Sequence, residues 1–168
     1  MDNVLYIFSG LPGTGKTTIA KEISKKLKAV YIRIDTIEQG IRDLCNFNVQ
    51  GEGYRLAYRV IADNLDIGNS VVVDSRNPIK ITRDEYENIA LENNCKYINI
   101  EIICSNKNEH KNRIETREND IKNLELPKWD DIVKRDYEEW DKDHIIIDTA
   151  SKNIKDCINE LINKLNME

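Results

Sequence analysis

The chain lacks any run of about 18 apolar residues, the length that a membrane-spanning helix needs, so we expect no membrane span. Histidine and cysteine are also scarce. The two histidines belong to no cluster and none of the four cysteines forms a Cys-x-x-Cys pair; these residues are Cys45, Cys95, Cys104, Cys157, His110 and His144. Neither a zinc site nor a disulfide framework is therefore expected, and reduced thiols in a cytoplasmic protein are the simpler interpretation.

Positive charge is not in excess either. The net charge is −5 at pH 7, and charged residues are spread along the chain. Proteins that capture nucleic acid by charge carry a basic surface. The composition thus argues against nucleic acid as a general partner, although it leaves room for a local basic cleft.

No repeat, low-complexity stretch or linker interrupts the 168 residues. A chain of this length is typical of one domain. The chain enters a predicted strand almost at once, which leaves no room for a signal peptide and favours a cytoplasmic location. We therefore expect a single domain over residues 1–168, present as a monomer or a homodimer.

A glycine-rich loop near the beginning of the chain is the most informative segment. Residues 10–17 match the P-loop pattern G-x-x-x-x-G-K-[ST], between an apolar run at residues 4–8 and a predicted helix. Backbone N–H groups at a helix start attract phosphate oxygens, and glycines let the backbone curl around them. The predicted nucleotide-binding residues are Gly10, Leu11, Pro12, Gly13, Thr14, Gly15, Lys16, Thr17 and Thr18.

Two side chains of this loop have separate expected tasks. Lys16 would reach the β- and γ-phosphates of a nucleotide, and the Thr17 hydroxyl would bind Mg²⁺. The expected cofactors are therefore ATP and Mg²⁺. A guanine-reading N-K-x-D motif is absent, because Asn106-Lys107-Asn108-Glu109 ends in glutamate and is explained more simply as a helix cap.

Strand-like and helix-like segments alternate along the chain. Strands are predicted at residues 4–9, 29–35, 70–74, 97–104 and 144–148. Helices are predicted at residues 15–27, 36–46, 53–67, 82–94, 106–122, 128–141 and 152–166. Several strands are continuous apolar runs, which is typical of a parallel sheet covered on both faces. The sequence predicts a doubly wound α/β fold that binds its ligands at the carboxyl ends of the strands.

Asp35 follows the second predicted strand, which would place its carboxylate at the same sheet edge as the P-loop. A carboxylate there can accept the proton of a hydroxyl that attacks phosphorus. The segment Asp35-Thr36-Ile37-Glu38 also matches a capping box for the next helix. Both roles stay open for Asp35 at this point.

Asp74 ends the third predicted strand, as a Walker B carboxylate that holds Mg²⁺ does. The alternative is an ordinary aspartate that bonds the turn before Pro78. Arg76 stands two residues further on and would bind an anionic or polar group of the substrate. Thr17 and Asp74 are thus the predicted metal ligands, and Asp35 and Arg76 the predicted substrate contacts.

Arg113 and Arg117 are four residues apart on the predicted helix 106–122 and would share one face. Two guanidinium groups on one face suit the charge that spreads over a phosphoryl group during transfer. The alternative is a solvated face on which Glu109 pairs with Arg113. On the first interpretation, residues 110–128 form a lid that carries two catalytic arginines, of which Arg113 also contacts the nucleotide.

These residues together resemble a known family. The chain is similar to small P-loop kinases of the AAA-like ATPase and phosphotransferase group, which includes chloramphenicol phosphotransferase, gluconate kinase, zeta toxins and the kinase domain of polynucleotide kinases. The resemblance covers essentially the whole chain, with matches at residues 10–18, 35, 71–74, 113–117, 126–129, 137–140 and 146–150.

The resemblance implies a three-layer, nucleoside-monophosphate-kinase-like fold with a five-stranded, mostly parallel sheet and a short helical lid. It implies that Asp35 is the base, that Arg113 and Arg117 are lid arginines, and that residues 148–150 lie beside adenine. The segment at residues 74–77 matches the substrate loop of no one member closely, so the acceptor does not carry over. Whether Asp35 or Asp74 takes the proton also stays open.

The sequence therefore predicts an ATP- and Mg²⁺-dependent kinase that phosphorylates a hydroxyl of a small molecule, with Lys16, Asp35, Arg113 and Arg117 as catalytic residues. One alternative is a polynucleotide 5′-hydroxyl kinase or repair module, which requires a basic channel. Another is a nucleotide-binding regulator or toxin-like protein with little ATPase activity.

Overall fold

The protein is represented by a computed structural model that describes residues 3–166. Its five strands form one sheet in the order β2-β3-β1-β4-β5, and every neighbouring pair is parallel. The strands are β1 (Val4–Ser9), β2 (Val30–Arg33), β3 (Val71–Asp74), β4 (Lys96–Ile103) and β5 (Ile145–Asp148). The predicted five-stranded parallel sheet is confirmed.

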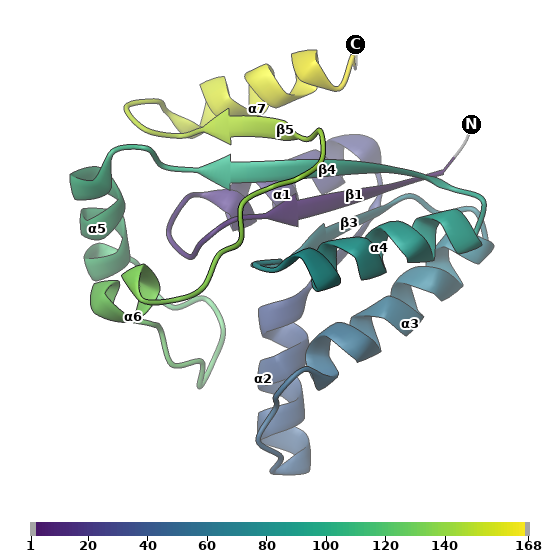
Figure 1. Ribbon diagram of the computed structural model, residues 1–168. Coiled ribbons are helices and arrows are strands. Elements are labelled where there is room, and N and C mark those ends of the chain that lie inside the picture. The colour runs from purple at the N-terminus through teal and green to yellow at the C-terminus, as the bar shows by residue number, and fades with distance from the viewer. Residues whose placement is uncertain (1–2, 167–168) are drawn as a thin grey trace.

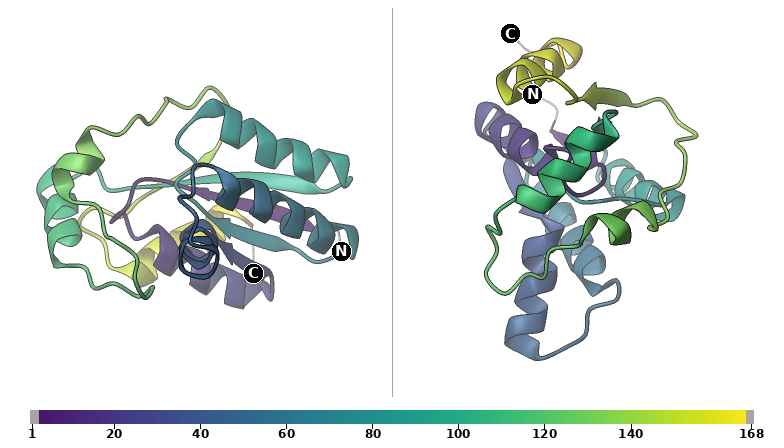
Figure 2. Two further views of the ribbon diagram at one scale, coloured as in Figure 1. Left: turned by 90° about the horizontal axis from the view of Figure 1, so that it is seen from below. Right: turned by 90° about the vertical axis from the view of Figure 1, so that its left-hand side faces the viewer.

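Helices cover both faces of the sheet, as Figure 1 shows. Helices α1 (Lys16–Leu27) and α7 (Ile154–Lys164) pack on one face, and α3 (Glu52–Asp66) and α4 (Lys80–Glu92) pack on the other. Helix α2 (Ile34–Cys45) packs against α3 and extends away from the sheet. Two shorter helices, α5 (Lys107–Thr116) and α6 (Trp129–Val133), lie beyond the carboxyl ends of the strands (Figure 2).

The apolar runs explain why the sheet is buried on both sides. Successive side chains of a strand point to opposite faces. In β1, Leu5 and Ile7 accordingly join the core under α3 and α4, whereas Tyr6 and Phe8 join the core under α1 and α7. The predicted three-layer α/β architecture is confirmed.

Two predicted helices are shorter than the sequence pattern indicates. The helix predicted at residues 106–122 ends at Thr116, and the helix predicted at 128–141 ends at Val133. The lid segment predicted at residues 110–128 is therefore helical only in its first part. The backbone beyond Val133 leaves the helical path because the carbonyl groups of Glu138 and Glu139 accept hydrogen bonds from Arg83, at 2.7 and 3.2 Å.

The second strand also ends earlier than predicted. Helix α2 begins at Ile34, so Asp35 lies within its first turn rather than at the end of the strand. The residue before the helix is Arg33, and no side chain caps the helix there. The capping-box interpretation of Asp35 is therefore wrong.

No helix within residues 3–166 is long and apolar enough to cross a membrane. The first two and last two residues of the domain predicted at 1–168 lie outside the described part of the chain.

Candidate active site

The P-loop has a backbone conformation that only glycine accommodates. Gly10 has a φ of +140°, and a Cβ placed on it would lie 2.3 Å from the backbone oxygen of Ile102. Gly13 has a φ of +82°, and its Cβ would lie 2.4 Å from Cδ1 of Ile114. Helix α1 then begins without a side-chain cap, so its first N–H groups are available to a ligand. This combination fits a phosphate group.

Lys16 and Thr17 of the P-loop meet Asp74 at the end of β3. The Lys16 ammonium group forms an ion pair with Asp74, and the Tyr31 hydroxyl donates a 2.7 Å hydrogen bond to the other carboxylate oxygen. Burial opposes ionisation of Asp74, but Lys16, Tyr31 and Thr17 outweigh it and hold its pKa below the ordinary value. An ionised carboxylate beside a threonine hydroxyl is a donor set that suits Mg²⁺.

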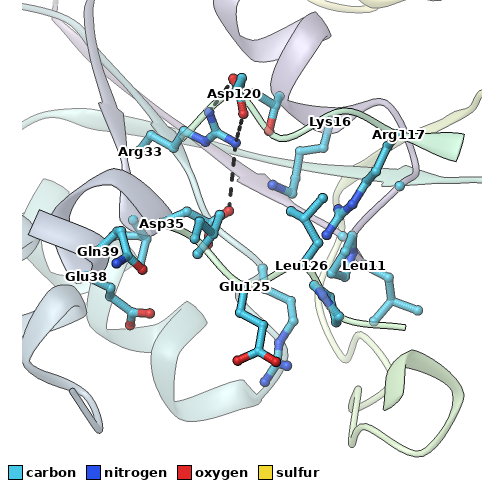
Figure 3. A pocket seen from close by; sticks show the side chains of 18 of the residues that line it. Leu11, Lys16, Arg33, Asp35, Glu38, Gln39, Arg117, Asp120, Glu125 and Leu126 are labelled. Atoms are coloured by element: carbon cyan, nitrogen blue, oxygen red, sulfur yellow. Dashed lines mark hydrogen bonds and ion pairs between the residues drawn. The ribbon is translucent and has the colours of Figure 1, made fainter. Parts of the chain in front are cut away.

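A cleft with a volume of about 1010 Å³ opens between the P-loop, α2 and the segment after α5. Asp35 lies on the α2 wall with 58% of its side chain exposed, and its nearest cation is Arg33 at 4.0 Å. Figure 3 shows Asp35 and Glu38 on the same helix, with Lys16 and Arg117 across the cleft. The predicted catalytic groups thus share one cavity.

Glu38 is a second cleft carboxylate that sequence reasoning considered only as part of a helix cap. It pairs with Arg42 at 3.4 Å, and burial raises its pKa above the ordinary value. The signal that could have identified it is its spacing, because residues three apart on a helix share a face and Asp35 was already a candidate.

Gly53 provides the space for Glu38 and gives a testable contrast between two helical glycines. A Cβ on Gly53 would lie 2.2 Å from Cγ of Glu38, whereas a Cβ on Gly40 would meet nothing within 4 Å. Gly53→Ala is therefore expected to lower the free energy of unfolding by about 1–3 kcal/mol, because the site is overpacked. Gly40→Ala is expected to raise it by about 0.5–1 kcal/mol through helix propensity. Urea denaturation checks both values, and equal stabilisation by the two changes would contradict this packing.

Arg113 pairs with Glu109, which is the alternative that the sequence left open, and it makes additional contacts. Its guanidinium group pairs with Glu109 at 2.5 Å and also donates to the hydroxyl and carbonyl oxygens of Thr149, at 2.8 and 2.9 Å. The Thr149 hydroxyl in turn donates to the carbonyl of Thr14 in the P-loop. Arg113 therefore lines the cleft and also connects α5 to the P-loop through Thr149.

Arg117 lies beyond the end of α5, so the prediction that it shares a helix face with Arg113 is wrong. It nevertheless lines the same cleft. Its Nε is buried without a hydrogen-bond partner. Burial lowers the pKa of Arg117, the charge of Asp35 opposes this shift, and the neighbouring Arg135 and Arg33 lower the pKa further. A cation in these surroundings is stabilised by an incoming anion.

A long-range ion pair joins the segment after α5 to the body of the protein. Asp120 accepts hydrogen bonds from Arg33 at 2.7 and 3.0 Å and from Lys21 at 3.1 Å. The bond from Arg33 is the main reason that the pKa of Asp120 is well below its usual range. Sequence reasoning missed this contact because 87 residues separate Arg33 from Asp120.

Removing this ion pair should loosen residues 117–128. Asp120 is 52% exposed, so Asp120→Asn is expected to favour opening of the segment by only about 0.5–1 kcal/mol. Amide hydrogen exchange of residues 117–128 measures this opening. Because the folded pKa is lowered, the contribution is complete above the unfolded pKa of about 4 and is lost only in stronger acid. Exchange that becomes several-fold faster in wild type between pH 8 and pH 5, after correction for intrinsic rates, would contradict this assignment.

The helix cap expected at Asn106 is present, because its side chain accepts hydrogen bonds from the amides of Asn108 and Glu109. Glu109 does not complete a capping box and binds Arg113 and the amide of Ser151 instead. Arg76, the predicted substrate contact, lines the cleft, and its carbonyl accepts a 3.1 Å hydrogen bond from the amide of Gly10. The structure thus brings Arg76 next to the P-loop.

Comparisons with known proteins agree with this architecture. The chain is 30% identical over 177 residues to the L-seryl-tRNA(Sec) kinase of Methanococcus maripaludis, covering 95% of this chain and 65% of that protein. It is 28% identical over 174 residues to the adenylyl-sulfate kinase of Prochlorococcus marinus, covering 97% of this chain and 83% of that protein. The chain thus spans about two thirds of the length of the first relative and more of the second.

The structure of Kti12 from Chaetomium thermophilum in complex with ADP-AlF3 has the same fold, with a TM-score of 0.70, 21% identity and 96% of each chain covered. The family model described as chromatin associated protein KTI12 matches residues 4–168. This chain therefore belongs to the KTI12 family, with the fold of the small P-loop kinases.

Proposed function

We propose that this chain is a cytoplasmic, ATP- and Mg²⁺-dependent phosphotransferase that moves the γ-phosphoryl group to a hydroxyl of a small molecule. The observation that carries the proposal is the pair of cleft walls, with a P-loop on one side and the exposed carboxylate of Asp35 on the other. A protein that only binds nucleotide needs the P-loop but does not need a carboxylate on the opposite side of the cleft. The kinase names of the two sequence relatives support the same proposal.

On the donor side, the P-loop backbone and Lys16 bind the β- and γ-phosphates. Lys16 exchanges its ion pair with Asp74 for phosphate oxygens, since its ammonium group already lies in the loop. Thr17 and Asp74 would hold Mg²⁺, which neutralises charge on the phosphate oxygens when it is bound. Arg117 contacts the transferring group and offsets the charge that develops there.

On the acceptor side, Asp35 takes the proton of the attacking hydroxyl. Asp74 is less suited to this task because its side chain is 1% exposed and three donors already occupy it. Residues 110–128 act as the lid, with Arg113 fixing the helical part to the P-loop and Asp120 fixing the loop part to β2 and α1.

Exchanging the two cleft carboxylates for their amides separates their roles. Asp35→Asn is expected to lower kcat by about 10²-fold, the lower end of the range for general-base catalysis, because positioning supplies most of the acceleration in phosphoryl transfer. Glu38→Gln is expected to change kcat by less than Asp35→Asn. Steady-state kinetics with an active acceptor measures both values, and the reverse order would transfer the base role to Glu38.

The test of the function is a screen of nucleosides, sugars, polyols and antibiotics for acceptor-dependent ADP release. We expect at least one class of hydroxyl compound to increase ADP release over the rate with water alone. An equal rate with every compound would contradict the kinase proposal.

A second candidate is a nucleotide-binding regulator with little ATPase activity. The description of the family as chromatin associated favours it. This candidate predicts tight nucleotide binding together with no response to any acceptor in the same screen.

A further inference from the structure

Arg76 and Arg135 line the active-site cleft from parts of the chain that are distant in sequence. Arg76 follows β3, and Arg135 follows α6. Three other cleft arginines have carboxylate partners: Asp120 for Arg33, Glu38 for Arg42 and Glu109 for Arg113. Within residues 3–166, Arg76 and Arg135 form no ion pair.

The two guanidinium groups influence each other electrostatically. Burial lowers the pKa of Arg135, and the charge of Arg76 lowers it further. Asp131 and Asp35 act in the opposite direction on Arg135, but neither forms an ion pair with it. Two like charges that face one cavity repel each other, and an anion that lies between them offsets this repulsion.

A buried arginine holds the two segments together. Arg83 is 2% exposed and donates to the carbonyls of Asn77 and Pro78, at 3.3 and 3.2 Å, in the loop that carries Arg76. It also donates to the carbonyls of Glu138 and Glu139, three and four residues beyond Arg135.

Further contacts strengthen this junction. The amide of Glu138 donates to the carbonyl of Pro78 at 2.8 Å, and the Glu138 carboxylate accepts from the amide of Lys80 at 2.6 Å. The Arg83 guanidinium lies over the rings of Trp140 and Tyr137, at 4.1 and 5.3 Å. These contacts join the segments that carry Arg76 and Arg135, so the fold sets the spacing of the two arginines. The spacing does not depend on two independent loops.

The pair lies on the acceptor side of the cleft. The charge of Arg76 acts on Glu38 and Tyr54, and the charge of Asp35 acts on Arg135, which also influences Arg117. Arg113, by contrast, is fixed on the β5 side of the P-loop by Thr149. Because Lys16, Arg117 and the loop backbone already serve the nucleotide phosphates, the charge of Arg76 and Arg135 remains for another anion.

We propose that the acceptor carries an anionic group besides its reactive hydroxyl, and that Arg76 and Arg135 bind this group. This inference rests on the proposed function, because it takes the bound molecule to be the acceptor of the phosphoryl group. The shared chemistry is that of a phosphate, sulfate or carboxylate group, which a pair of guanidinium groups binds through charge-assisted hydrogen bonds. The anion holds the small molecule so that its hydroxyl faces Asp35.

Inorganic sulfate is the first probe, measured by calorimetry with the P-loop saturated by MgADP. We expect one sulfate to bind in addition to MgADP. Arg76→Ala and Arg135→Ala should each weaken its binding by about 10- to 100-fold, the effect of losing a hydrogen bond to a charged group. Arg59→Ala removes an exposed arginine of α3 outside the cleft and serves as the matched control, with unchanged binding.

Absence of sulfate binding to the MgADP complex, or equal binding by wild type and both cleft variants, would overturn the proposal. This measurement needs no turnover, so it decides the anion site even if the kinase proposal fails. If MgADP does not bind, the comparison of sulfate binding between wild type and the two variants still decides it.

Matched acceptor pairs form the second arm and distinguish the sources of the anion. Ribose is compared with ribose 5-phosphate, glycerol with glycerol 3-phosphate, and glucose with gluconate. We expect the anionic member of at least one pair to have a KM at least tenfold lower, and Arg135→Ala to remove that preference. Activity with neutral members alone, or with an RNA 5′-hydroxyl alone, would overturn the small anionic acceptor.

Discussion

Lys16→Ala is expected to lower ATP turnover by about 10²–10³-fold, the loss typical of removing one donor that stabilises the transition state. Lys16 is the P-loop ammonium group and the cation nearest to the predicted magnesium ligand Asp74. Its removal takes positive charge away from the phosphates that would be transferred. Acceptor-stimulated ADP release measures the effect.

The Lys16 variant also needs a control for folding, because it leaves Asp74 buried without its ammonium partner. The double variant Lys16→Ala, Asp74→Asn removes that charge and is expected to regain stability without regaining activity. Lys25→Ala, an exposed position on the same helix, is expected to keep wild-type turnover. Full turnover by folded Lys16→Ala would exclude the mechanism.

Arg83→Met is expected to lower the free energy of unfolding by about 3–5 kcal/mol, because several carbonyl groups lose a donor and each unsatisfied buried polar group costs about 1–3 kcal/mol. Methionine keeps an apolar stem against Trp140 but leaves the carbonyls of Asn77, Glu138 and Glu139 without the donor that Arg83 provides. Urea denaturation measures the loss.

Arg59→Met is the matched control for this stability measurement. Arg59 is exposed on α3, so its replacement is expected to change stability by no more than about 0.5 kcal/mol. If Arg83→Met were as stable as Arg59→Met, residues 75–79 and 134–144 would not be joined as described. The spacing of Arg76 and Arg135 would then lose its support.

Much of the fold could be predicted because its signals are local. The run Val71–Asp74 is apolar up to its last residue and forms a completely buried strand. The P-loop has its glycines, lysine and threonine within eight residues, so this short motif and the segments on either side of it together predict a strand, a loop and a helix. The parallel sheet and the two helical layers follow from the alternation of strands and helices along the chain.

The missed features depend on contacts between distant residues. The helix predicted to reach residue 141 ends at Val133 because Arg83 donates hydrogen bonds to backbone carbonyls beyond Val133. The sequence near residue 133 does not indicate these hydrogen bonds. The ion pair of Arg33 with Asp120 is hidden in the same way. Arg135 lies just beyond the early end of α6 and lines the cleft, a position that the sequence pattern did not indicate.

The central claim is that the P-loop binds a nucleoside triphosphate whose terminal group is then transferred. Calorimetry of wild type and Lys16→Ala with a non-hydrolysable ATP analogue and Mg²⁺ tests it most directly. We predict one binding site in wild type and an affinity at least about tenfold lower in the variant, the loss expected for a charge-assisted hydrogen bond. Absence of binding to any purine triphosphate would contradict the account.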